Sequence, residues 1–469
     1  MILEAFRWIG YATILYFVVM QLYLFALAVY SGFVLRRNYH MRRFGRINEM
    51  LSSQTSPPIS IVIPAYNEVA GIVDSVRSMS IVSYPRFEIV VCNDGSIDGT
   101  LETLIEAFNL TQVRIPYRPD IETAPIRAIY RGRGAVDITV IDKENGGRAD
   151  ALNAAINAAR YPYVLCTDAD VVLDGKALVR GMQRVVEDRE RTICVGGNIR
   201  PINGSNVGLG HLITPGVPRG MIARMQVLEY LRTFLATRPA WSALSALPLV
   251  SGAFGIWKRS AIFDLGGYQP GHLGEDLDLT MRMHRYHIDN AIPYRIVYEP
   301  SAVLWTEVPD TVRVLRRQRI RWHRGLITAI RDFRSMTFNP RYGTLGMVTW
   351  AAFFLFEFLA PFLEAIGWVV VPTAYFLGAL DTETLILMIL LALGAGLMNS
   401  LVALWLDEPY GFFNRPIDTS RLIVIALIEN FGLRQMTVYW RVRAAFGARK
   451  THAWGNMERR GVANLGIEA

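Results

Sequence analysis

Two long runs without a charged residue constrain most strongly what this chain can fold into. Trp8–Leu35 and Thr384–Leu406 contain no Asp, Glu, Lys or Arg. Because a helix needs about 20 apolar residues to cross a bilayer, each run is long enough to span one. A third apolar stretch, residues 342–380, is interrupted only by Glu357 and Glu364. The sequence therefore predicts several membrane helices, one of them near the amino terminus.

Basic residues set the expected orientation of these helices. Five arginines closely follow the first run, namely Arg36, Arg37, Arg42, Arg43 and Arg46. Since Lys and Arg beside a span mark its cytoplasmic side, we expect the chain after residue 36 to lie in the cytosol. The run exceeds the apolar core of about 7–15 residues found in signal peptides, so we expect it to be retained. The predicted location is the inner or plasma membrane, crossed several times, with a cytosolic domain.

The number of crossings after that domain stays open at about three or four. The basic tail, from Arg434 through Arg460, should also prefer the cytosol, which requires an even number of later crossings. Either Pro361 and the two glutamates split the third stretch into two short helices, or the last segment, Leu422–Ile428, lies along the interface.

The central part has a different pattern. Between residues 57 and about 300, short β-rich runs alternate with helical ones, which is typical of an α/β fold with a parallel sheet and crossover helices. The Pro- and Arg-rich stretch 116–133 is predicted to be a connection. We predict strands at 59–64, 87–92, 136–141 and 163–166, and helices at 69–80, 99–108 and 148–160.

Polar side chains follow all four predicted strands. These segments are Tyr66–Glu68, Asn93–Asp94, Asp142–Asn145 and Asp168–Asp170. In open α/β sheets, ligands bind beyond the carboxyl ends of the strands. One such ending is ordinary loop chemistry, but four in succession predict a binding site at this edge.

Asp168 and Asp170 are two residues apart in an extended segment, so both carboxylates can reach one side of the chain. Such hard oxygen ligands suit Mg²⁺ or Mn²⁺ bridging a diphosphate, whose other ligands are water and phosphate oxygens. Alone, the pattern is more often a loop with capping aspartates. Its place at the ligand edge favours the metal site.

The net charge and the cysteine spacing limit which binding partners we expect. The chain has 49 basic and 41 acidic residues, a formal net charge of +8, which suits anionic lipid head groups and anionic substrates. No aromatic-basic RNA or DNA motif accompanies this charge, so we expect no nucleic acid. Cys92, Cys166 and Cys194 have no metal-ligand spacing and are predicted to be free, buried thiols.

An ordered series of motifs resembles the processive family-2 glycosyltransferases over roughly residues 57–325. The motifs are VIPAYNE, NDGSIDGT, DKENGGRADALNAAINAA, TDAD, SGAFGIWKR, GEDLDL and QRIRW. That family includes cellulose, chitin, hyaluronan and poly-N-acetylglucosamine synthases, and the resemblance implies a GT-A fold, an inverting mechanism and a UDP-sugar donor. The segments SGAFGIWKR and GEDLDLTMRMHR look most like poly-N-acetylglucosamine synthases, which favours UDP-N-acetylglucosamine.

The resemblance also implies roles for the matching residues. Asp276 is the catalytic base, and Asp168 and Asp170 hold the metal. Tyr66 and Glu68 lie by the nucleotide base and Asp94 binds the uridine part. The full donor-binding set is Pro64, Tyr66, Glu68, Asp94, Lys143, Arg148 and Asp168, and the residues that hold the acceptor and close over the donor are Glu275, Gln318, Arg321 and Trp322. Arg148 stands where the family commonly has lysine.

The chemistry of glycosyl transfer agrees with these roles. A carboxylate must lie within about 2.6–3.2 Å of the acceptor hydroxyl to take its proton. Asp276 can do this, although acids at a helix N-terminus are also favoured by the helix dipole. The departing diphosphate needs positive charge, which a metal with Lys143, Arg148 or Arg321 can supply.

The expected organisation follows from these patterns. It comprises a transmembrane helix at 1–36, a basic cytosolic linker at 37–56, a GT-A domain with interface helices at 57–335, transmembrane or interface helices at 336–446, and a basic cytosolic tail at 447–469. We expect a metal-dependent enzyme that polymerises a UDP-sugar into a β-linked polysaccharide and exports it through its own helices. Its expected partners are the donor, the growing polysaccharide and the bilayer, and a partner subunit is left open.

Two alternatives remain at this stage. A non-processive enzyme that adds one sugar to a polyprenyl-phosphate carrier would share the donor site but would not need QRIRW. A catalytically inactive membrane scaffold that binds nucleotide or polysaccharide predicts the loss of a carboxylate. Asp94, Asp168, Asp170 and Asp276 are all present, which argues against the scaffold.

Overall fold

The computed structural model describes residues 2–43, 56–114, 117, 119–132, 134–208, 211–413 and 415–447. They form two compact units, which we call the sheet unit and the helical unit. The sheet unit contains Ser245–Val308 and the described residues of His40–Pro218. The helical unit contains Arg219–Leu244 and the described residues of Met1–Tyr39 and Pro309–Thr451. Most of the expected basic linker and the expected tail lie outside the described residues.

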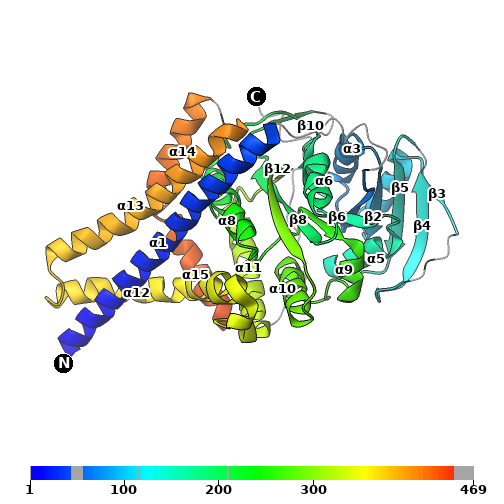
Figure 1. The fold of residues 1–469 in the computed structure, drawn as a ribbon. Coiled ribbons are helices and arrows are strands. Elements are labelled where there is room, and N and C mark those ends of the chain that lie inside the picture. The colour runs from blue at the N-terminus through cyan, green and yellow to red at the C-terminus, as the bar shows by residue number, and fades with distance from the viewer. Residues whose placement is uncertain are drawn as a thin grey trace. The chain divides into compact units, whose positions relative to one another are not determined.

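The sheet unit is built on a mixed sheet with the strand order β3-β4-β5-β2-β1-β6-β11-β8-β12-β7, and a small sheet pairs β9 with β10 (Figure 1). The strands are β1 (Ile59–Ala65), β2 (Phe87–Asn93), β3 (Thr111–Gln112), β4 (Ile126–Gly132), β5 (Asp137–Lys143), β6 (Tyr163–Cys166), β7 (Val171–Leu173), β8 (Thr192–Pro201), β9 (Asn206–Gly208), β10 (His211–Thr214), β11 (Gly255–Lys258) and β12 (Arg295–Thr306).

The four predicted strands form the parallel centre of this sheet. The parallel pairs are β5 with β2, β2 with β1, and β1 with β6, and their bounds agree with the prediction to within two residues. The predicted parallel pairing does not extend to every strand beyond this centre. β11 runs antiparallel to both β6 and β8, and β4 runs antiparallel to β5.

The predicted connection at 116–133 contains the strand β4, which the sequence analysis missed. Its apolar residues are interrupted by Arg127 and Arg131, and most of its residues are half-buried. An outer strand of this kind lacks the continuous apolar run that marks a strand buried on both faces. β1 and β2 do show such a run, and nearly all of their residues are buried.

The sheet unit also contains the helices α3 (Ile72–Ser80), α4 (Thr100–Ala107), α5 (Arg148–Ala158), α6 (Ala177–Glu187), α9 (Arg259–Asp264) and α10 (Glu275–Asp289). α5 packs on β1 and β2, and its small residues from Ala149 to Ala155 are buried there. α6 packs on β8 and β12. The three cysteines are buried free thiols, as predicted, and burial raises the pKa of Cys166 to about 12.

The helical unit contains α1 through Tyr39 and seven further α-helices. α1 spans Ile2–Arg43, and the others are α7 (Met221–Leu231), α8 (Arg238–Ala243), α11 (Val312–Asp332), α12 (Ala360–Phe376), α13 (Thr382–Asp407), α14 (Pro416–Ile428) and α15 (Leu433–Phe446). In the described part of the chain, Arg7–Asn38 and Thr382–Tyr410 are long and apolar enough to cross a membrane. Two bent helix pairs bring the number of candidate spans to as many as four, by length and composition.

The third apolar stretch is bent, and its two helices together make one candidate span, so the number of crossings that the sequence left open stays a prediction. Leu345–Phe358 and Ala360–Phe376 meet at an angle of 41°, with Pro361 in the first turn of α12. The second bent pair joins Pro416–Ile428 to Leu433–Phe446 at 57°. Proline fits a first helical turn because that position has no backbone hydrogen bond to lose.

Candidate functional site

The loops after β1 and β2 are tied together by backbone contacts. The amide of Asp94 donates to the carbonyl of Ala65 at 2.8 Å, which joins the ends of the two strands. The amide of Glu68 donates to the hydroxyl of Thr100 at 3.0 Å. Pro64, at the end of β1, and Tyr66 and Glu68 in the following loop are half-buried. The predicted donor residues of these two loops therefore lie at one edge of the sheet.

Asp94 is held by the loop that follows β5. Its Oδ1 accepts hydrogen bonds from Lys143 Nζ at 2.6 Å and from the amide of Gly146 at 3.0 Å. Its Oδ2 accepts one from the amide of Gly147 at 2.8 Å. Asn145 donates its side-chain amide to the backbone carbonyl of Asp94 at 2.8 Å. This network fixes the Asp94 carboxylate beside the start of α5.

Two glycines make this contact, and the sequence analysis gave them no role. Gly147 has φ = +89°, in the left-handed region that favours glycine. A Cβ at Gly146 would approach Asp150 Oδ1 to 2.6 Å, too close for any side chain. The adjacent glycines in Asn145-Gly146-Gly147 could have indicated this contact from the sequence, because paired glycines before a helix commonly expose backbone amides.

Lys143 occupies the buried space between Asp94 and Asp150. Its side chain is fully buried, and Nζ lies 2.6 Å from Asp94 Oδ1 and 2.5 Å from Asp150 Oδ1. Burial opposes the charged form, but the two carboxylates outweigh it and raise the pKa of Lys143. In this geometry Lys143 positions Asp94 and the start of α5, and its ammonium faces these acids.

We expect Lys143→Met to destabilise the sheet unit strongly. The change leaves Asp94 and Asp150 without their shared cation, and breaking a buried ion pair costs about 3–5 kcal/mol. The measurement is the unfolding midpoint of the purified chain in detergent. Lys176→Met serves as the control, because Lys176 is exposed in the same unit and should cost no more than about 0.5 kcal/mol. Equal midpoints for the two variants would contradict the assigned network.

Arg148 connects the end of β6 to the start of α10. Its Nε and Nη2 donate to Asp168 Oδ1 at 2.9 and 2.7 Å, and its Nη1 donates to Glu275. Nη2 also donates to the carbonyl of Gly252 at 2.9 Å. A guanidinium can serve three acceptors in one plane, which a lysine ammonium does not match in geometry. Arg148 therefore brings residues distant in the sequence into one cluster.

The same cluster holds Asp276. Its Oδ2 accepts a hydrogen bond from the amide of Gly252 at 3.1 Å, and its Oδ1 accepts one from the amide of Leu277 at 2.9 Å. Asp276 is half-buried in the first turn of α10, where the helix dipole stabilises an ionised carboxylate. Gly252 thus contacts both Arg148 and Asp276, and no sequence pattern assigned it that role.

Arg148 is a cation among the acids Asp168, Glu275 and Asp276 in this cluster. Burial opposes the charge on Arg148, but Asp168 and Glu275 outweigh it and hold the Arg148 pKa well above its usual range. Burial raises the pKa of Glu275, and Arg148 offsets part of that effect. The guanidinium consequently stays charged over the whole working pH range and fixes Asp168 on one side.

The two acidic residues after β6 are suited to bind a divalent cation whose other ligands come from a phosphorylated molecule. Asp168 and Asp170 are half-buried in the loop between β6 and β7. Among the described residues, no group of three or more His, Cys, Asp or Glu side chains is arranged to hold a metal ion. Mg²⁺ needs only one or two carboxylates when phosphates and water complete its shell, so this donor set is sufficient.

The QRIRW segment lies on α11, in the helical unit. Gln318 is buried, Arg321 is half-buried, and Trp322 is 41% exposed. The guanidinium of Arg319 lies 4.6 Å from the centre of the Trp322 ring and is paired with Glu229. Arg319, to which the sequence analysis gave no role, therefore positions the Trp322 ring.

Polar side chains within the apolar helices are paired inside the helical unit. Glu364 accepts from Arg434 Nε at 2.9 Å, and Glu357 lies 3.3 Å from Arg441 Nη2. Asn399 on α13 donates to Gln21 Oε1 on α1 at 2.7 Å. Polar groups at membrane depth commonly face a protein interior in this way.

Two family models match overlapping parts of the chain. Residues 60–242 match the model of glycosyl transferase family 2, and residues 163–399 match that of glycosyl transferase family group 2. The first match covers the strand-end loops with Asp94, Arg148 and Asp168. The second covers Asp168, Asp276 and the QRIRW segment on α11.

Two curated relatives have the same description. A poly-β-1,6-N-acetyl-D-glucosamine synthase of Staphylococcus epidermidis is 30% identical over 282 residues, which cover 59% of this chain and 57% of the relative. One of Staphylococcus aureus strain COL is 28% identical over 329 residues, covering 70% and 68%. The chain thus matches little more than half of the first relative. A solved mannosyltransferase of Pyrobaculum calidifontis, in complex with GDP-Man and Mn²⁺, aligns with a TM-score of 0.49 at 18% identity, over 91% of this chain and 98% of that one.

Proposed function

Because the chain belongs to glycosyl transferase family group 2, we propose that it transfers sugars from a UDP-sugar to the end of a growing polysaccharide. One observation carries this proposal. Arg148 joins Asp168, at the predicted diphosphate edge, to Glu275, the neighbour of the predicted base Asp276. The names of the Staphylococcus relatives support UDP-N-acetylglucosamine as the donor and a β-linked polymer as the product. The parallel centre of the sheet, with Asp168-Ala169-Asp170 at the end of β6, supports a GT-A fold.

Asp276 acts as the general base in this proposal. The acceptor hydroxyl gives its proton to the Asp276 carboxylate while its oxygen bonds to the anomeric carbon of the donor sugar. The bond from that carbon to the diphosphate breaks on the opposite side, UDP leaves, and the configuration at the carbon inverts. Gly252 and Leu277 hold both carboxylate oxygens of Asp276 through backbone amides. The base is thereby oriented before the acceptor arrives.

The charge of the leaving diphosphate must be offset at the end of β6. A divalent cation bound to Asp168 and Asp170 would supply that charge when present. Arg148 fixes Asp168 and balances the nearby Glu275, so the acids can stand close together in a half-buried site. Lys143 contributes by holding Asp94 in place for the nucleoside. We further propose that Gln318, Arg321 and Trp322 bind the acceptor sugar, with Trp322 offering its exposed area.

The test of the donor assignment is release of UDP. The full chain in nanodiscs is incubated separately with UDP-N-acetylglucosamine, UDP-glucose, UDP-N-acetylgalactosamine and UDP-glucuronate, each with Mg²⁺ or Mn²⁺. We expect release of UDP and a polymer with UDP-N-acetylglucosamine. Release with another donor alone would redirect the substrate, and no release with any donor would contradict the enzyme assignment.

We also propose that the helical unit lies in the bacterial inner or plasma membrane and carries the polymer outward. Beyond α1, the described chain offers α13 and two bent pairs as further candidate spans, more than an anchor requires. Glu357, Glu364 and Asn399 each contact another side chain of the helical unit, so these polar residues are explained as interior contacts. Support for export therefore comes from the candidate spans that follow QRIRW, the predicted acceptor-binding motif.

Sealed vesicles with the sheet unit facing out provide the measurement for export. Donor is added outside, and the product is then exposed to an added glycosidase. We expect a polymer that is protected until detergent opens the vesicles. A product with one added sugar would favour transfer to a polyprenyl-phosphate carrier, and a polymer that is always digested would rule out export by this chain.

A further inference from the structure

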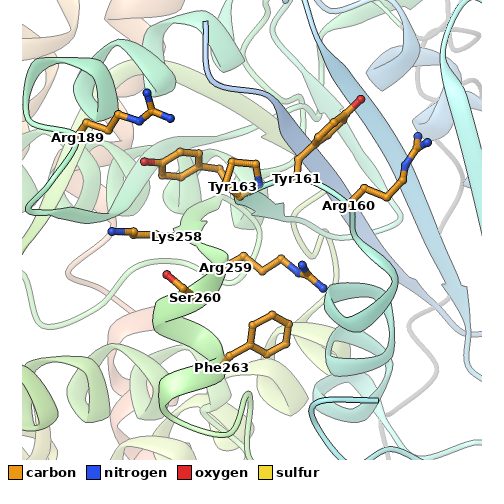
Figure 2. A pocket seen from close by; sticks show the side chains of 9 residues that line it. Arg160, Tyr161, Tyr163, Arg189, Lys258, Arg259, Ser260 and Phe263 are labelled. Carbon is orange, nitrogen blue, oxygen red and sulfur yellow. The ribbon is translucent and has the colours of Figure 1, made fainter. Parts of the chain in front are cut away.

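A cavity of about 410 Å³ lies in the sheet unit away from the Asp168 end of β6. It is formed where β6 begins, at Tyr163, and where its antiparallel neighbour β11 ends, at Lys258. Its lining residues are Arg160, Tyr161, Pro162, Tyr163, Arg189, Lys258, Arg259, Ser260 and Phe263 (Figure 2). The volume lies in the range of about 300–1,000 Å³ that small-molecule sites occupy.

Four cations line this cavity, and none of its nine described lining residues is acidic. Arg160 is balanced, because it pairs with Glu88 at 2.6 Å and Asp137 at 2.7 Å. Arg189 contacts the Tyr163 side chain by a hydrogen bond. An excess of positive charge therefore remains among Arg189, Lys258 and Arg259, and it favours an anion.

Arg259 is held at the carboxyl end of α5. Its Nε donates to the carbonyl of Ile156 at 2.9 Å and its Nη2 to that of Asn157 at 3.0 Å. Its guanidinium also lies 4.6 Å from the centre of the Phe263 ring. Burial lowers the pKa of Arg259, and the carboxylates of Asp120 and Glu88 offset part of that effect. An anion in the cavity would stabilise the Arg259 charge further.

We propose that this cavity binds a phosphate-bearing small molecule. Arg and Lys are the side chains that bind phosphate through charge-assisted hydrogen bonds, and Ser260 adds a hydroxyl donor. Tyr161 and Phe263 supply apolar ring surface beside the cations, which suits a ligand larger than the phosphate group itself. The phosphate could belong to a soluble metabolite or to a lipid head group, and the experiment separates these sources.

The site is connected to the proposed catalytic cluster by two short elements. α5 begins with Arg148 in that cluster and ends at the carbonyls that Arg259 holds. β6 begins at Tyr163 in the cavity and ends two residues before Asp168. A ligand that shifts Arg259 therefore acts on the helix that positions Arg148, and we expect its binding to change the KM for the donor.

Binding is tested on the full chain in nanodiscs without donor or divalent metal, so the outcome does not depend on the proposed transferase activity. The first probe is inorganic phosphate in phosphatidylcholine discs, and the second is phosphatidic acid included in the discs. The readout is hydrogen exchange of the segments 158–163, 186–191 and 256–263. We expect protection that saturates with one probe. Protection by inorganic phosphate indicates a soluble ligand, protection by phosphatidic acid alone indicates a lipid head group, and protection by neither overturns the proposal.

Paired variants show whether the cavity is the site. Arg189→Gln with Lys258→Gln removes two lining cations, and Arg191→Gln with Lys176→Gln removes the same charge from exposed positions outside it. We expect the first pair to weaken binding by at least about tenfold and the second to leave it within about twofold. Similar losses of binding in both double variants would show that net charge causes the effect and would overturn the proposed site. If the first pair lowers the unfolding midpoint, Lys258→Gln alone gives the same comparison against Lys176→Gln alone.

Discussion

Asp276→Asn should bind donor normally and lose turnover by about 10² or more. The change keeps the size of the side chain and one acceptor oxygen for the amides of Gly252 and Leu277, but it removes the carboxylate that takes the proton. A positioned general base contributes about 10²–10⁴ to the rate. The measurement is kcat from UDP release, with the Kd for UDP determined separately. A fall in kcat at an unchanged Kd is the expected signature.

Asp289→Asn is the matched control for this variant. Asp289 is an exposed carboxylate at the last position of the same helix, α10. Its loss should leave kcat within about twofold, since exposed substitutions of this kind have small effects. If Asp276→Asn also stayed within a few-fold of the parent protein, the assignment of the base would be wrong. A loss of UDP binding together with turnover would instead indicate a structural role.

The edge of the sheet that carries the site could be predicted from the sequence. Parallel strands end at a common edge, so recognising the strands before Asp94 and Asp168 was enough to place both residues at the same edge of the sheet. The buried runs of β1, β2, β5 and β6 gave a strong signal because both faces of each strand are covered. β4 gave a weak signal, because Arg127 and Arg131 interrupt its apolar residues, as is common in an outer strand.

The contacts inside the site could not be predicted in the same way. Gly252 meets Arg148 across 104 residues of sequence, and its place in the SGAFGIWKR motif did not reveal that contact. Lys143 and Asp94 were both predicted to contact the donor, but buried opposite charges pair with each other when no ligand lies between them. The basic cavity could not be predicted because its cations, Arg160, Arg189, Lys258 and Arg259, come from segments that are far apart in the sequence.

The metal assignment makes the second large prediction, for Asp170→Ala. Asp168 is fixed by two hydrogen bonds from Arg148, so a cation at this edge depends strongly on Asp170 as its other carboxylate. Removing it should abolish the gain in UDP affinity that Mg²⁺ or Mn²⁺ provides and lower turnover by at least about 100-fold, because metal charge on a leaving group is worth several kcal/mol. Calorimetric titration of UDP, with metal and with EDTA, measures the binding effect without any turnover.

Asp174→Ala separates loss of metal binding from loss of negative charge. Asp174 follows β7, and its Oδ1 lies 3.7 Å from Arg180 Nη1. Its substitution removes one carboxylate from the same stretch of chain and leaves Asp168 and Asp170 unchanged. We expect this control to keep the difference in UDP affinity between metal and EDTA. A parent protein that binds UDP equally in both conditions would refute a metal on these aspartates. Arg148 would then be the main cation of the cluster, and its two bonds to Asp168 would have to orient that acid for a donor bound without metal.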